Sequence, residues 1–74
     1  MRDKEIAIAA IKQEAMSKPD EKIVAGRVIL TYKELCQKID NGDKTIYKLF
    51  VEPYIRMLRE SKEFKAKVME MLGV

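Results

Sequence analysis

The fold of this chain is decided by residues 31–50, which read TYKELCQKIDNGDKTIYKLF. Thr31 and Glu34 have the spacing of a capping box, in which the hydroxyl accepts the third amide of a helix and the carboxylate accepts the amide of the cap. A helix is therefore predicted to begin at Tyr32. Its buried face is expected to comprise Leu35, Cys36 and Ile39, which recur at helical spacing.

A second helix is predicted after a short turn. Asn41-Gly42 can supply the left-handed residue that commonly ends a helix. Asp43 or Thr45 is then expected to cap a helix that runs from Lys44 onward, because both side chains can accept a free amide of the first turn.

Pro53 complicates this helix, since proline lacks an amide hydrogen and its ring clashes with the carbonyl four residues earlier. Apolar residues nevertheless keep helical spacing on both sides of it. Two interpretations stay open. Either one helix is kinked between Val51 and Pro53, or a helix stops near Val51 and another begins with Pro53 in its first turn.

The last helix carries the clearest amphipathic pattern in the chain. Ser61 can cap its start, and Gly73 can stop it. The apolar residues between them follow a helical spacing, namely Phe64, Val68, Met71 and Leu72.

The first helix is expected to be capped by Asp3 and to run to about Met16. Its apolar residues extend around most of its circumference, which is wider than the stripe of an ordinary surface helix. It should therefore either be surrounded by neighbouring helices or be pressed against another chain.

The segment between these helices is expected to hold a short helix from Pro19 to Ala25, because proline and acidic residues favour a helix start. Gly26 breaks the pattern. The β-branched run Val28-Ile29-Leu30 is interpreted as an extended, buried connector.

Together these elements predict a single helical domain over residues 1–74, of the all-α class, folded as a small four- or five-helix orthogonal bundle. Its core is expected to comprise Ile6, Ile11, Ile23, Leu30, Leu35, Ile39, Ile46, Leu49, Phe50, Leu58, Phe64, Val68 and Leu72.

Composition excludes several kinds of chemistry. The 74 residues include no histidine and one cysteine, Cys36, so neither an intramolecular disulfide nor a four-ligand zinc site can form. Cys36 lies on the predicted buried face, where a free cysteine acts as a small apolar residue. We therefore expect no catalytic activity, no metal and no cofactor. Heavy use of Lys, Glu and Ile is typical of thermophile proteins.

Charges interrupt every apolar run, so no membrane span is predicted. The opening Met1-Arg2-Asp3-Lys4-Glu5 also lacks the apolar stretch of a secretory signal, and a cytoplasmic location is expected.

The first functional hypothesis is a small interaction or scaffold module that binds a protein partner or another copy of itself. A chain this short buries a limited core, and neither a disulfide nor zinc can reinforce it. Burying the broad apolar surface of the first helix against a partner would add stability.

The alternative hypothesis is nucleic-acid binding by a helix-turn-helix-like region from Tyr32 to Phe50, in a chain with 15 basic and 12 acidic residues and a net charge of +3. The residues expected at the major groove are Lys44, Thr45, Tyr47 and Lys48. Those expected at phosphates are Lys33, Lys38, Arg56 and Arg59. Asp40 stands where such motifs usually carry glycine, so a longer or differently shaped turn is expected.

One segment supports this alternative by resemblance. Gly26 to Leu35 resembles the Gly-x-Val-x-Thr-Tyr-x-x-Leu approach to the DNA-binding helices of alkyltransferase-like proteins, with one extra residue between Gly26 and Thr31. The reactive Pro-Cys-His-Arg signature of that family is absent. The resemblance therefore implies contact with DNA and no alkyl transfer.

Overall fold

The computed structural model describes residues 2–73, which form five α-helices, one π-helical turn and a two-stranded antiparallel sheet. The elements in chain order are α1 (Asp3–Ser17), β1 (Lys22–Ala25), β2 (Val28–Thr31), α2 (Tyr32–Asp40), α3 (Lys44–Ile46), η1 (Tyr47–Val51), α4 (Glu52–Glu60) and α5 (Lys62–Leu72). The protein is thus mostly helical, as predicted, but the sheet makes the all-α assignment too narrow.

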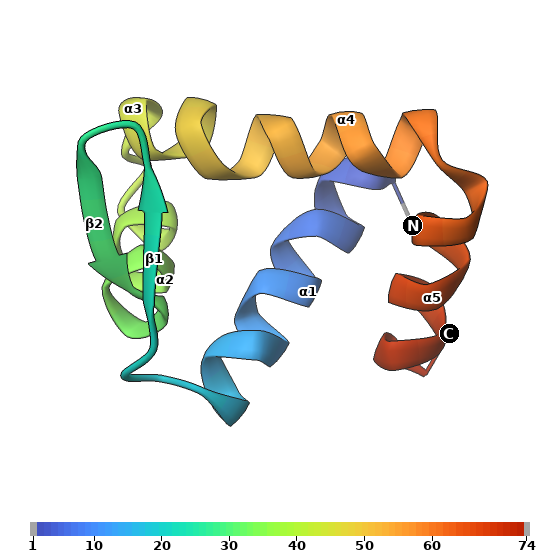
Figure 1. Ribbon diagram of the computed structural model, residues 1–74, viewed down its shortest axis with the longest axis horizontal. Helices are drawn as coiled ribbons and strands as arrows, with labels where there is room; N and C mark the ends of the chain where they lie inside the picture. Colours follow the sequence, from blue (N-terminus) through green and yellow to red (C-terminus); the bar gives the residue numbers. More distant parts are fainter. Residues whose placement is uncertain (1, 74) are drawn as a thin grey trace.

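Helix α1 lies at the centre of the molecule. Figure 1 shows it crossing between α2 with the β-hairpin on one side and α5 on the other, while the segment from α3 to α4 runs across one end. It contacts α2, η1, α4 and α5. Ile6, Ala7 and Ala10 have no exposed surface. Neighbouring helices of the same chain therefore surround α1, which was one of the two explanations for its broad apolar surface.

The expected helix from Pro19 to Ala25 is wrong, because this segment forms strand β1 of a hairpin. Lys22–Ala25 pairs antiparallel with Val28–Thr31, and Ile23 faces Leu30 across the pair. The carbonyls of Pro19 and Glu21 accept the amides of the first turn of α2, each at 3.1 Å, instead of bonding within a helix of their own. The extended segment thus supplies hydrogen-bond acceptors for amides that have no partner within α2.

Gly26 makes the hairpin turn possible. Its φ is +60°, while no residue other than glycine has a positive φ within residues 2–73. A positive φ at the first of two central residues is the arrangement of a type II′ turn, which suits the twist of paired strands. The extended conformation of Val28–Thr31 was predicted, although Ile29 proves to be exposed rather than buried.

Pro53 is accommodated within one continuous helical path from Lys44 to Glu60. The turn before it widens into η1, where the amide of Glu52 donates to the carbonyl of Tyr47, five residues back. Val51 and Glu52 keep helical φ and ψ angles. The wider turn relieves the crowding that proline causes in an α-helix, and Pro53 lies in the first turn of α4.

Most of the predicted helix caps are present in the structure. The capping box of Thr31 and Glu34 is present, and the Ser61 hydroxyl accepts the amide of Phe64 at 3.1 Å. Between the two candidates for the helix at Lys44, Asp43 is the cap. Asp3 caps nothing, because it lies inside α1, where its carboxylate forms ion pairs with α4 and α5.

The core is close to the one expected. The predicted residues that are buried are Ile6, Ile11, Leu30, Leu35, Ile46, Leu58 and Val68. The half-buried ones are Ile23, Ile39, Leu49, Phe50, Phe64 and Leu72. Val51 is fully buried and was not expected, because its place beside Pro53 made it a candidate helix end.

Candidate functional site

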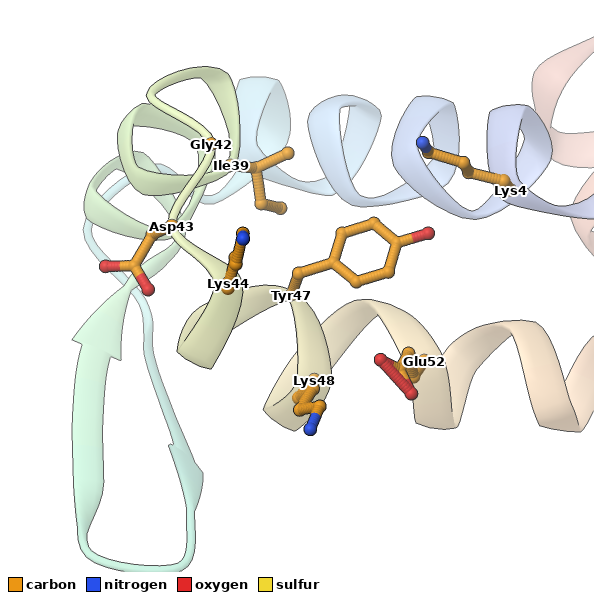
Figure 2. A pocket seen from close by; sticks show the side chains of 8 residues that line it. All are labelled: Lys4, Ile39, Gly42, Asp43, Lys44, Tyr47, Lys48 and Glu52. Carbon is orange, nitrogen blue, oxygen red and sulfur yellow. The ribbon is translucent and has the colours of Figure 1, made fainter.

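Three lysines line a pocket of about 390 Å³ between α1, the end of α2 and the start of the α3–α4 segment. Figure 2 shows the side chains that line it. They are Lys4, Ile39, Gly42, Asp43, Lys44, Tyr47, Lys48 and Glu52.

A tight connection between α2 and α3 positions two of the lysines. Gly42 adopts φ +76°, and its amide donates to the carbonyl of Ile39 at 3.0 Å, which ends α2. Asp43 then caps α3 by accepting the amide of Ile46 at 3.0 Å. Because the new helix starts at Lys44, this residue and Lys48 lie one turn apart on its exposed surface.

Tyr47 joins this turn to α1. Its half-buried ring extends from the helix toward Lys4, whose Nζ lies 5.5 Å from the ring centroid (Figure 2). That distance is typical of a cation–π contact. Tyr47 therefore lines the pocket between the two helices, while Lys44 and Lys48 are exposed to solvent.

A second pocket of about 430 Å³ continues along the same helix. It shares Tyr47 and Glu52 with the first and adds Arg56 and Arg59, together with Ile55 and Glu60. The two pockets are therefore adjacent. We call the surface that they span the basic face, defined by Lys4, Lys44, Lys48, Arg56 and Arg59.

Most cations of the basic face are not neutralised by a partner. Within residues 2–73, Lys4, Lys44, Lys48 and Arg56 form no ion pair. Arg59 is the exception, because its Nε lies 3.4 Å from Asp3. Glu52 lies between the two pockets and adds a negative charge to the centre of the face.

Five of the eight site residues predicted from the sequence are brought together on this face, namely Lys44, Tyr47, Lys48, Arg56 and Arg59. Lys33 lines a different pocket, beside Lys12 and Asp40. Thr45 and Lys38 line neither pocket of the basic face. Sequence reasoning missed Lys4, because nothing in its local sequence indicates that the start of α1 lies beside Tyr47.

Cys36 is half-buried on α2, near the ion pair of Lys12 with Asp40, which measures 2.9 Å. Burial raises the pKa of its thiol, and the Asp40 carboxylate raises it further. Both effects favour the protonated thiol over the reactive thiolate at neutral pH.

Neither a cluster of metal ligands nor a membrane-spanning helix is found among residues 2–73. No three carboxylate or thiol side chains gather there as potential metal ligands. None of the helices in this range combines the length and the apolar character that crossing a membrane requires.

Comparison of the chain with protein-family models, with curated proteins and with solved structures found no match. Function is therefore inferred from the residues and their geometry.

Proposed function

We propose that this protein binds nucleic acid, and that the basic face contacts the phosphate backbone of duplex DNA. The observation that carries the proposal is the convergence of Lys4 from α1 with Lys44 and Lys48 around one pocket, with none of them in an ion pair within residues 2–73. Unpaired cations on one surface are what a polyanion recruits, because binding releases its condensed counterions.

The arrangement of the helices supports the same proposal. Helix α2 and the helix that begins at Lys44 are separated by the three-residue turn 41–43, which has the length usual for a helix-turn-helix pair and is not longer than usual. Lys44, Thr45 and Lys48 are exposed at the start of the second helix, the end that such motifs insert into the major groove, between the two phosphate backbones. Arg56 lies further along the same helix and would contact a flanking phosphate.

The first experiment measures affinity for a fluorescent DNA duplex by anisotropy at several salt concentrations. The double variant Lys44→Gln/Lys48→Gln should bind more weakly and show a shallower salt dependence, by about one unit in slope for each phosphate that the variant no longer neutralises. Lys62→Gln/Lys67→Gln is the matched control, because it removes two exposed lysines from α5. No binding by the natural protein at low salt, or equal losses in both variants, would contradict the proposal.

A second variant tests for a gain of affinity, which unfolding cannot imitate. Glu52 is exposed and lies between the two pockets, so its charge should repel a phosphate that crosses the face. Glu52→Gln should therefore strengthen binding, whereas Glu63→Gln on α5 should change it little. Unchanged or weaker binding by Glu52→Gln would place the nucleic acid elsewhere on the protein.

We also propose self-association, on a separate observation. Val24 and Ile29 face each other across the hairpin and are 67% and 61% exposed, which places two large apolar side chains together on its outer surface. A second copy could cover them with its own hairpin. The pair is small beside the ~800 Å² per partner of a standard interface, so the association should be weak.

Sedimentation velocity over a wide concentration range tests this second proposal. The natural protein should show a rising average mass at high concentration, and Ile29→Lys should abolish the rise because it places a charge on the shared surface. A monomer at every concentration would contradict it. This measurement is independent of DNA binding, so the two proposals can fail separately.

A further inference from the structure

A third pocket, of about 180 Å³, lies where the hairpin, α1, α2 and the α3–α4 segment meet. Figure 1 shows how these four parts of the chain converge. Three of the five aromatic residues of the protein line the pocket: Tyr32, Phe50 and Tyr54. Its other lining residues are the aliphatic Ile11, Ile23, Val24 and Leu35 and a single acid, Glu14.

Glu14 gives the pocket its charge. Its carboxylate acts on both phenols: after burial, it is the next cause that raises the pKa of Tyr32 and of Tyr54. Lys18 offsets this charge incompletely, because its Nζ lies 3.7 Å from Glu14 and 3.7 Å from Glu21. One cation is thus shared between two carboxylates, so Lys18 does not neutralise both of them.

This combination selects one kind of ligand. An anion would be repelled by Glu14, and a divalent metal ion would need several oxygen ligands where the walls are apolar. A methylated ammonium group suits both features, because its charge is attracted to aromatic rings and to a carboxylate while its methyl groups cover apolar surface. The volume also suits a small cation better than a drug-sized molecule, which occupies about 300 to 1,000 Å³.

We propose that this pocket is an aromatic cage that binds a methylated ammonium group, with Tyr32, Phe50 and Tyr54 as its aromatic walls and Glu14 as the counter-charge. The site is separate from the basic face, and the two share no lining residue. The ligand is either a free quaternary ammonium compound or the methylated side chain of a lysine.

The test is a titration of the isotope-labelled protein with choline, followed by NMR. Choline should shift the resonances of the three aromatic residues in a saturable way. The comparison ligand is 3,3-dimethyl-1-butanol, which has the same shape with carbon in place of the charged nitrogen. It should bind several-fold more weakly. Equal binding of the two, or no saturable shift with choline, would overturn the proposal.

Variants separate the contributions of ring and charge. Tyr32→Phe keeps the ring and should retain binding, whereas Tyr32→Leu should weaken it by about 2- to 30-fold, the range that one cation–π contact provides. Glu14→Gln should reduce the preference for choline over the alcohol without abolishing it, because the aromatic rings still attract the cation, and Glu63→Gln on α5 should leave the preference intact. If the ring of Tyr32 contributed only volume, the variants Tyr32→Leu and Tyr32→Phe would bind choline with equal affinity.

The two sources of the ligand are distinguished with blocked amino acids. Acetyl-trimethyllysine methylamide that binds more tightly than choline, with the unmethylated lysine derivative binding weakly, assigns the site to a methylated lysine. Tighter binding of choline assigns it to a free compound. Equal binding of the methylated and unmethylated lysine derivatives would contradict recognition of methyl groups.

Discussion

Helix α1 and the β-hairpin are both rich in apolar residues, yet these residues are largely buried in the helix and partly exposed in the hairpin. Ile6, Ala7 and Ala10 of α1 have no exposed surface, whereas Val24 and Ile29 of the hairpin are 67% and 61% exposed. The helix is packed by other helices on several sides, but a two-stranded sheet that packs on α2 has only one covered face. Apolar content therefore indicates burial only together with the position of an element in the fold.

The largest expected effect on stability comes from removing a buried side chain of the central helix α1. Ile6→Ala removes a fully buried side chain and leaves a cavity that its neighbours fill only in part, so unfolding should become easier by about 2 to 5 kcal/mol. Chemical denaturation followed by circular dichroism measures the change. Met16→Ala on the same helix is the control, because this side chain is 84% exposed and its loss should cost about 0.5 kcal/mol or less. Similar losses in both would contradict the central position of α1.

The hairpin should depend on its turn more than on its outer side chains. Gly26→Ala places a β-carbon at φ +60°, where no other atom crowds it within 4 Å, so the cost is backbone strain of about 1 to 2 kcal/mol. Arg27→Ala is the control, since its φ is not positive. Thermal unfolding of both variants measures the difference. A stability of Gly26→Ala equal to that of the control would show that the turn relaxes freely.

The contrast between α1 and the hairpin also shows which features of the fold the sequence predicts and which it does not. Signals confined to a few neighbouring residues were reliable: the capping box at Thr31, the cap at Ser61 and the helix stop at Gly73 are all found as predicted. The hairpin was missed because Pro19 with the acids after it imitates a helix start. The opposing signal was present in the β-branched pairs on either side of Gly26-Arg27, which are typical of a hairpin with a two-residue turn.

The residues of the candidate site also fall into two groups, those that the local sequence predicts and those that it does not. Lys44 and Lys48 were predicted because they follow a recognisable cap on one helix. Lys4 and the aromatic pocket were not, because they depend on contacts between elements far apart in the chain. Tyr32, Phe50 and Tyr54 form no local motif, and only the packing of the hairpin, α2 and the long helix brings them to one pocket.

A smaller effect on stability is expected at the start of α1, where Asp3 forms ion pairs with α4 and α5. The side-chain hydrogen bond from Lys65, at 2.9 Å, and the nearby Arg59 lower the pKa of Asp3 below its ordinary value of 3.8. The folded protein therefore binds this proton less readily than the unfolded chain does. The stabilisation is complete above pH 3.8 and is lost as the pH falls through that value toward the lower folded-state pKa.

Asp3→Asn tests this linkage, because it keeps the size of the side chain and removes its charge. The variant should be less stable than the natural protein at pH 6, and the difference should shrink as the pH falls toward 3, as measured by urea unfolding. High salt should also reduce the difference, because surface ion pairs are screened. A difference that stays constant with pH would assign the effect to packing instead.

The smallest effect is expected on the outer surface of the hairpin. Ile29→Thr keeps a β-branched side chain suited to a strand and removes apolar surface that is already 61% exposed, so the stability of the dilute protein should change by about 0.5 kcal/mol or less. The measurement is urea unfolding at low micromolar concentration, where weak association is negligible. If copies associate through Val24 and Ile29, the variant should lose only the stability that the natural protein gains at high concentration. A loss of more than about 1 kcal/mol at low concentration would instead mean that the outer face of the hairpin is packed within the monomer, which would remove the contrast with α1.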